Sequence, residues 1–110
     1  MASFNKIRVI GRVGGDPELV YTTSGAVMIK FPLATTYRWT DITGIAREHS
    51  TLFCVQFWGQ RAEKLCGVLA RDSIVFVYGR LRIIENVDRQ GNRRATVELS
   101  ASDIQTIESV

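Results

Sequence analysis

The chain of 110 residues is poor in the residues that mark metal sites, disulfide scaffolds and many enzymes. Its two cysteines, Cys54 and Cys66, are too few and too far apart for a disulfide scaffold or a metal site, so we interpret them as reduced thiols. Its one histidine, His49, lies in the polar segment "REHST" without a recognisable nucleophile and orienting acid. No Walker, HExxH, CxxC or EF-hand pattern occurs. The sequence therefore predicts no enzyme, no metal and no other cofactor.

Long apolar runs are also absent. None approaches the length of about 20 residues that spans a bilayer, and the start "MASFNKIRV" lacks the apolar core of a secretory signal. We therefore expect an intracellular protein without a membrane partner. The hydrophobic fraction of 45% is typical of a chain that folds, and the length is that of one domain, residues 1–110.

Lysine is scarce among the basic residues. Only three of the fourteen lysine and arginine residues are lysine, and the formal net charge is +3. Arginine binds phosphate through a planar fork and also stacks on flat rings, whereas a surface that is basic only for solubility would more often use lysine. The charge favours an anionic partner.

Alternating apolar and polar residues predict five β-strands, at 4–13, 26–36, 51–59, 73–84 and 95–101. Between the third and fourth strands the apolar period changes to that of a helix, over residues 60–71. This order is typical of a small all-β Greek-key barrel of the OB type with one short helix, whereas a sandwich would need about seven strands.

Several features interrupt the predicted strands. Residues 14–18, "GGDPE", predict a turn, and residues 36–50 lack apolar periodicity, which predicts a long loop. Pro32 predicts a bulge or an edge position, and Gly79 a bulge or a close approach of two backbones.

Two tryptophans lie among polar and basic residues. Trp39 lies in the polar run "TTYRWTD" beside Arg38, and Trp58 lies on the side of its strand opposite the apolar set. The other basic residues at or near outward positions are Lys6, Arg8, Lys30, Arg80 and Arg82, with Arg93 and Arg94 at the root of the last hairpin. Single-stranded nucleic acid needs this combination, because cations follow its phosphates and each ring stacks on an unpaired base for about 1–3 kcal/mol.

An ordinary structural role is the alternative for each residue. Trp58 could cap the barrel or fill a subunit interface, Trp39 could pack on its own loop, and the arginines could simply be solvated. A duplex reader is disfavoured, because the one predicted helix has mixed charge rather than a base-reading face.

The segments "NKIRVIGRVGGDPELVYTTSG", "FPLATTYRWTD", "VQFWGQRAEKL", "SIVFVYGRLR" and "DRQGNRRATVEL" resemble bacterial-type single-stranded DNA-binding proteins in order and spacing, over residues 4 to 102. The resemblance implies an OB barrel that binds single-stranded DNA in replication, recombination or repair. It also implies a homo-oligomer, with a tetramer favoured and a dimer left open, and a cytoplasmic, nucleoid-associated location, with an organellar version left open. It assigns base stacking to Trp39 and Trp58, and phosphate contacts to Arg71, Arg82 and Arg94.

The chain departs from the family pattern at several positions. Leu52 and Asn86 stand where the family has stacking tryptophans, and Phe53 stands where histidine is frequent. The loss of two stacks removes about 2–6 kcal/mol per subunit, which predicts weaker binding or a shorter bound path. The end "IQTIESV" lacks the family's Gly-rich linker and acidic tip, so tail-mediated protein partners are not expected. The apolar residues Leu52, Phe53, Ile83 and Ile84 are candidates for a subunit interface.

Two other functions remain open at this point. One is an OB-fold dimer resembling primosomal replication protein N, which contacts helicase-loading proteins and binds DNA moderately. The other is an RNA-binding or purely structural OB protein.

Overall fold

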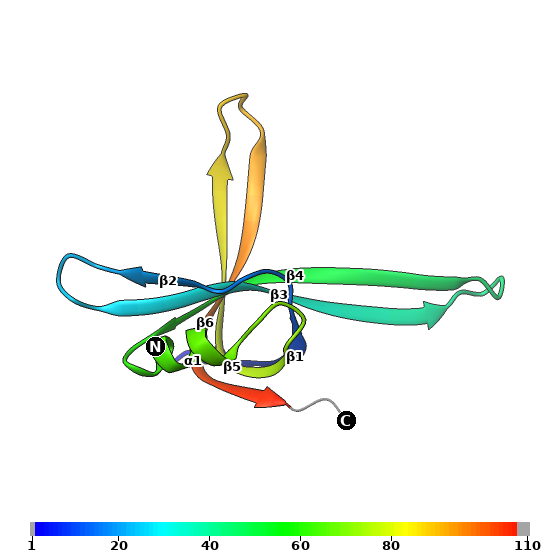
Figure 1. Ribbon diagram of the computed structural model, residues 1–110. Helices are drawn as coiled ribbons and strands as arrows, with labels where there is room; N and C mark the ends of the chain where they lie inside the picture. The colour runs from blue at the N-terminus through cyan, green and yellow to red at the C-terminus, as the bar shows by residue number, and fades with distance from the viewer. Residues whose placement is uncertain (1, 108–110) are drawn as a thin grey trace.

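The computed structural model describes residues 2–107 as six strands and one helix (Figure 1). The elements are β1 (Ile7–Val13), β2 (Glu18–Tyr21), β3 (Val27–Thr40), β4 (Ala46–Trp58), α1 (Arg61–Val68), β5 (Ile74–Val87) and β6 (Arg93–Ile107). Within residues 2–107 no helix is both long and apolar enough to cross a bilayer, and α1 has only eight residues.

Five of the strands close into a barrel. The sheet order is β1-β5-β6-β4-β3-β2, and an additional pairing of β1 with β3 joins the two sides. β4 and β6 run parallel, whereas the other pairs are antiparallel. This confirms the predicted OB barrel. The helix lies between β4 and β5 rather than between a third and a fourth strand, because the four-residue β2 was not predicted from the sequence.

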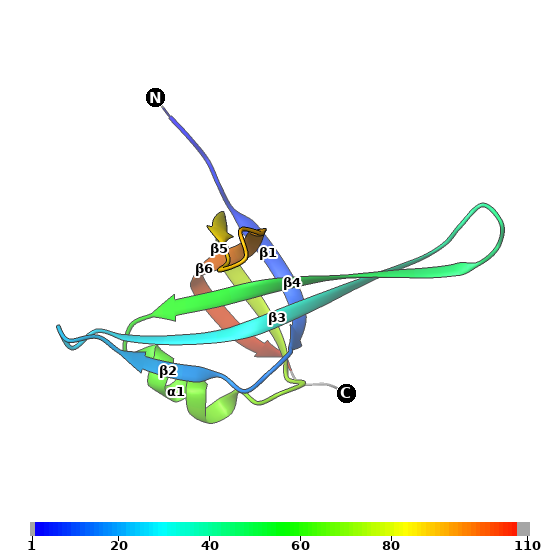
Figure 2. The same cartoon turned by 90° about the horizontal axis from the view of Figure 1, so that it is seen from above.

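The barrel core consists of the residues that alternate inward along the strands. The largest fully buried side chains are Val13, Ile29, Leu33, Val55, Val75, Val77, Leu99 and Ile104. Each contributes about 1.5–3 kcal/mol by leaving water. α1 packs against β2, β3 and β4 (Figure 2), and buries Ala62 and Leu65 on the core. The helix therefore covers one end of the barrel.

Two glycines allow strands to approach closely where the barrel bends. A Cβ on Gly11 would lie 2.6 Å from the Ala34 oxygen on β3. A Cβ on Gly79 would overlap the Ser100 carbonyl oxygen and lie 2.8 Å from Cα of Ala101. The pairing of β5 with β6 changes register between Tyr78 and Gly79. Both predicted features of Gly79, a bulge and a close approach, are confirmed.

Pro32 also occupies the kind of position that its sequence context predicts. β3 pairs with β2 over residues 27–30 and with β1 over residues 33–34, so Pro32 lies in the gap between these two partners. The Gly14 N–H donates to the Pro32 oxygen at 2.8 Å from that side. The missing N–H of proline faces the same gap, where it breaks no strand ladder.

The predicted loop over residues 36–50 is wrong, because most of it is paired strand. Residues 36–40 pair with residues 46–50, so β3 and β4 leave the barrel as a two-stranded arm with a turn at 41–45. A two-stranded ribbon has no buried face, which explains why the sequence lacks apolar alternation there. β5 and β6 form a second arm, with a turn at 88–92, and β2 and β3 form a third hairpin (Figure 1).

The tips of these three hairpins share one turn. The segments "TTSGA", "DITGI" and "DRQGN" each place glycine fourth, with φ of 90°, 84° and 82° at Gly25, Gly44 and Gly91. In each tip the glycine N–H donates to the first residue's carbonyl oxygen. The fifth residue's N–H donates to the first residue's side-chain oxygen. These bonds hold each tip in a defined conformation.

Gly79→Ala should destabilise the barrel by about 1–3 kcal/mol, because its methyl group would press on the backbone of β6. Gly67→Ala is the matched control. Gly67 lies in α1 with open space around its Cα, so alanine there should stabilise the protein by about 0.5–1 kcal/mol. Urea unfolding of both variants measures the difference, and an unchanged midpoint for Gly79→Ala would contradict the close approach.

Candidate nucleic-acid interface

The outward residues of β3, β4, β6 and β5 form continuous rows across the barrel surface. The register aligns Lys30 with Gln56, Ser100 and Arg80 in one row, and Pro32 with Cys54, Glu98 and Arg82 in the next. Trp58 ends β4 opposite Met28, on the same face. The outer surface of these four strands therefore carries Trp58 at the end of β4, and Arg80 and Arg82 on β5.

Trp58 borders a groove of about 490 Å³. The groove is also lined by Arg80 and Arg82, so the structure brings these three predicted residues together. Trp58 is 49% exposed, which leaves part of its ring free. Arg82 forms an ion pair with Glu98 at 3.4 Å, and the Gln56 amide donates to the same carboxylate at 3.4 Å. Glu98 thus offsets one of the two cations in the groove.

Asn5 is a groove residue that sequence reasoning missed. Its side-chain amide donates to the Leu81 oxygen at 2.8 Å, and its side-chain oxygen accepts the Leu81 N–H at 3.1 Å. These two bonds attach the segment before β1 to β5, beside Trp58. In the sequence, Asn5 is the first residue of the "NK" that begins the first segment resembling the family.

Trp39 lies on the β3–β4 arm, away from the Trp58 groove. Its ring stacks on Tyr37, with centroids 5.4 Å apart and an interplanar angle of 25°. In the register of β3 and β4, Tyr37 and Trp39 lie on the same face of β3 as Leu33. Trp58 lies on the opposite face of the ribbon. In register the two tryptophans therefore lie on opposite faces of the β3–β4 ribbon. The aromatic residues form two separate sites.

Ion pairs orient the basic side chains of the arm. Arg38 binds Glu48 across the ribbon at 2.9 Å. Arg47, opposite Trp39, binds Asp41 at the tip, also at 2.9 Å. The pKa of Asp41 is lowered to about 2, first by the Thr43 hydroxyl that donates to it and then by the Ile45 N–H and the Arg47 guanidinium. Asp41 is therefore charged at neutral pH, which keeps Arg47 beside the tip.

The β5–β6 arm ends in a second basic cluster. Arg93 and Arg94 are the first residues of β6, directly after the turn, so they lie beside the tip of the arm. Arg94 binds Asp88 at 3.4 Å. The pKa of Asp88 is lowered, first by the hydrogen bond that the Asn92 backbone N–H donates to it. Arg89, on the turn itself, adds a further cation that sequence reasoning did not single out.

The other predicted residues lie elsewhere. Lys6 and Arg8 lie over the Tyr78 ring, with charged atoms 5.4 and 5.5 Å from its centroid. Arg71 lies in the turn between α1 and β5, at the end of β5 opposite Arg82. Lys30 is paired with Glu18 at 3.5 Å. Within the described residues, no ion pair involves Lys6, Arg8, Arg71, Arg80 or Arg93.

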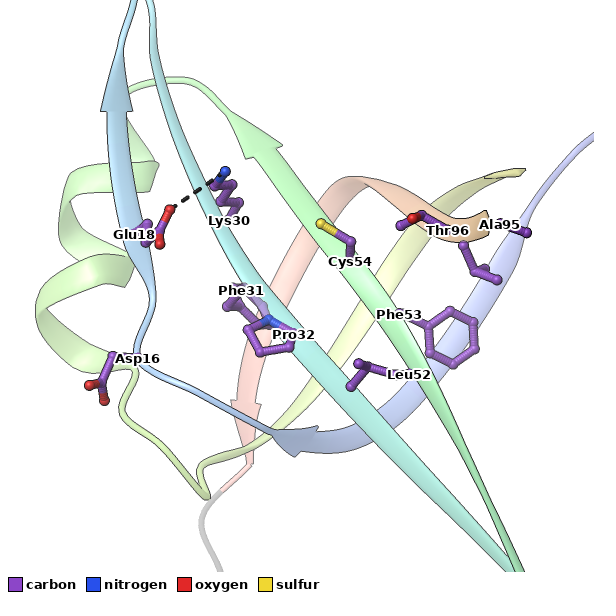
Figure 3. Close-up of a pocket in the computed structure, with 11 residues that line it drawn as sticks. Asp16, Glu18, Lys30, Phe31, Pro32, Leu52, Phe53, Cys54, Ala95 and Thr96 are labelled. Carbon is purple, nitrogen blue, oxygen red and sulfur yellow. Dashed lines mark ion pairs between the residues drawn. The ribbon is translucent and has the colours of Figure 1, made fainter. Parts of the chain in front are cut away.

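A second groove, of about 400 Å³, lies between β3, β4 and the start of β6 (Figure 3). Its apolar lining includes Leu52 and Phe53, and the Glu18–Lys30 ion pair lies at one end. Phe53 is only 9% exposed and belongs to the core of this chain, so its predicted place at a subunit surface is wrong. Cys54 also lines the groove, and its pKa is raised first by burial and then by the charge of Glu98.

Metal-binding side chains are not grouped within residues 2–107, where no cluster of three histidine, cysteine or acidic residues could hold an ion. Both cysteines are free thiols. The chemistry of the described surface is therefore that of rings, guanidinium groups and amides.

Known proteins resemble this chain in sequence. The sequence matches the single-strand binding protein family over residues 4–107. It is 36% identical to single-stranded DNA-binding protein 1 of Xylella fastidiosa (strain 9a5c), with 97% of this chain and 79% of that protein covered. It is 35% identical to single-stranded DNA-binding protein A of Bacillus subtilis (strain 168), with 94% of this chain but only 59% of that protein covered.

The fold agrees as well. The crystal structure of a small single-stranded DNA-binding protein from Streptomyces coelicolor superposes with a TM-score of 0.79 at 28% identity, with 93% of each chain covered. The match in sequence spans nearly the whole chain, and the match in structure includes the closed barrel. The chain therefore belongs to the single-strand binding protein family.

Proposed function

We propose that the protein binds single-stranded DNA without base specificity, through two stacking sites joined by basic residues. One site is Trp39 on the β3–β4 arm, and the other is Trp58 in the groove with Arg80 and Arg82. The observation that carries this proposal is that both tryptophans are about half exposed, at 41% and 49%, and that each has arginine beside it. Such binding protects exposed strands during replication, recombination or repair.

The path of the strand follows from the positions of the two rings on the β3–β4 ribbon. Because Trp39 lies on the arm and Trp58 lies opposite Met28 at the other end of the ribbon, one strand that stacks on both has to run along the ribbon. Arg93 and Arg94 on the β5–β6 arm offer further phosphate contacts beyond the Trp58 groove. Each ring contributes about 1–3 kcal/mol, and each phosphate contact makes binding more sensitive to salt.

A homotetramer is the oligomer that the free surfaces of the chain support. β1 pairs with β5 over residues 7–12 but with β3 only at Arg12 and Val13, so the rest of its second edge has no partner within the described residues. The outer face of β1, β5 and β6 also carries apolar side chains, including Ile10, Ile74 and Ile107. Two different self-complementary surfaces build a closed dimer of dimers, whereas one builds only a dimer.

Trp39→Ala and Trp58→Ala should each weaken binding to oligo-dT by about tenfold or more, because each removes one stacking surface. Trp39→Phe and Trp58→Phe are the matched variants, since each keeps a ring and leaves a single tryptophan. Both remaining tryptophans should lose fluorescence as oligo-dT is added. A tryptophan that stays bright at saturation, or an alanine variant that binds at full strength, contradicts its assignment.

Glu98→Gln should strengthen binding, because it frees Arg82 for phosphate and removes a negative charge from the groove. One additional contact should steepen the dependence of log K on log salt by about 0.7. Glu63→Gln on α1 is the control with the same change of charge outside the groove. Titrations at several salt concentrations test this, and equal slopes in the two variants would contradict the role of Glu98.

Ile10→Lys should convert the tetramer into dimers without unfolding the chain, because Ile10 is 61% exposed and lies on the outer face of β1. Val68→Lys, at an exposed site on α1, should leave the tetramer intact. Sedimentation over a range of concentrations measures the mass. A wild-type chain that remains a dimer rejects the tetramer and favours the alternative that resembles primosomal replication protein N.

A further inference from the structure

The β3–β4 arm carries a second aromatic ring, that of Tyr37. Residues two apart in a strand share a face, so Tyr37 and Trp39 project from the same side of the arm. Their rings are stacked, with centroids 5.4 Å apart. Tyr37 is nevertheless 68% exposed, more than Trp39 at 41%. One face of the tyrosine ring is therefore occupied by Trp39, and the other is open to solvent.

Packing within the described chain does not explain this ring. All residues of the arm from Tyr37 to Ser50 are exposed except Asp41 at the tip, so no core lies beneath the pair. Within the described residues the Tyr37 hydroxyl has no side-chain hydrogen bond, unlike that of Tyr21, which donates to Glu63 at 3.2 Å. An exposed aromatic pair on a bare ribbon costs solubility and adds little stability.

The open face of the Tyr37 ring points toward the barrel end of the arm. Trp39 lies on the tip side of Tyr37, and the next residue on the barrel side of the same face is Thr35, opposite Thr51 on β4. Both are small side chains that cannot cover an aromatic ring. In register the neighbours of Tyr37 on the barrel side of this face are therefore threonines, with no large side chain among them.

Basic residues lie across the ribbon from the two rings. Across the ribbon, His49 is opposite Tyr37 and Arg47 is opposite Trp39. Arg47 is held in place by Asp41 at 2.9 Å. Arg38, between the two rings in sequence, is held on the other face by Glu48. The two rings therefore have one oriented guanidinium group on their own face of the arm, beside Trp39.

We infer that Tyr37 is a base-stacking residue, and that Tyr37 and Trp39 together form a two-ring platform on which an unpaired nucleobase extends the stack from the tyrosine side. This inference rests on the proposed function and adds a contact that the family resemblance did not assign. The platform compensates for one of the two rings that Leu52 and Asn86 do not supply. The arm is then a larger share of the binding site than Trp39 alone would make it.

Affinity for oligo-dT tests the platform. Tyr37→Leu keeps an apolar contact with Trp39 but removes the ring, and should weaken binding by about tenfold. Tyr37→Phe keeps the ring and should bind like the wild type. Tyr21→Leu is the control, because Tyr21 is similarly exposed but lies on β2 against α1. The inference is overturned if Tyr37→Leu binds within twofold of wild type, if Tyr37→Phe is as weak as Tyr37→Leu, or if Tyr21→Leu loses as much.

Photocrosslinking separates contact from mere support of Trp39. An oligonucleotide that contains 5-iododeoxyuridine should crosslink to Tyr37 in the wild-type protein, and mass spectrometry of the peptides should locate the bond. Crosslinks at Trp39 with none at Tyr37 would show that the tyrosine only positions its neighbour, which overturns the inference. If the wild-type protein binds no oligonucleotide, the proposed function fails as well. Normal wild-type binding that is unaffected by Tyr37→Leu removes the inference alone.

Discussion

Closure of the barrel is the constraint on which the rest of the structure depends. β1 can reach β3 because Gly11 presents no side chain to the Ala34 oxygen, and β5 can bend against β6 because Gly79 presents none to Ser100. Once five strands have closed, strands longer than the barrel have no further sheet to join. They can only leave in pairs, as the β3–β4 and β5–β6 arms do (Figure 1). The arms are therefore a consequence of closure, and their two solvated faces are available for ligands.

Acidic residues accompany three of the candidate arginines at this surface. Arg38, Arg82 and Arg94 each have a carboxylate partner, at 2.9, 3.4 and 3.4 Å. Exposed ion pairs of this kind contribute little to stability, typically about 0–1 kcal/mol. Their effect on binding is larger, because each arginine must exchange a carboxylate for a phosphate. The pairs orient the side chains in advance. They also reduce the free energy that the protein gains from phosphate contacts, because each carboxylate has to be displaced first.

Apolar alternation predicted the barrel but not the arms, and the reason is physical. Ile29, Val55 and Leu99 alternate with polar residues because only one side of each strand faces the core. Beyond Thr36 the ribbon is held by its backbone ladder, so its side chains carry no such signal. Trp58 could be assigned to the outer face from alternation alone, and the register confirms that assignment. Tyr37 was not predicted, because no apolar alternation marks a face of the arm, although its spacing of two residues from Trp39 places both rings on one side of the strand.

Trp39 and Trp58 are each partly packed and partly exposed. The structural role and the base-stacking role that the sequence left open for them are therefore compatible. Trp58 lies opposite Met28, which is itself buried, so one part of the indole packs on the barrel while the rest borders the groove. Trp39 is held in the same way by Tyr37. A ring that is fully exposed would lose rotamer freedom when a base stacks on it, whereas a ring already held on one side loses less. Under the proposed function, packing and binding are therefore not alternatives for these residues, because the packed side of each ring holds its free side in place for a base.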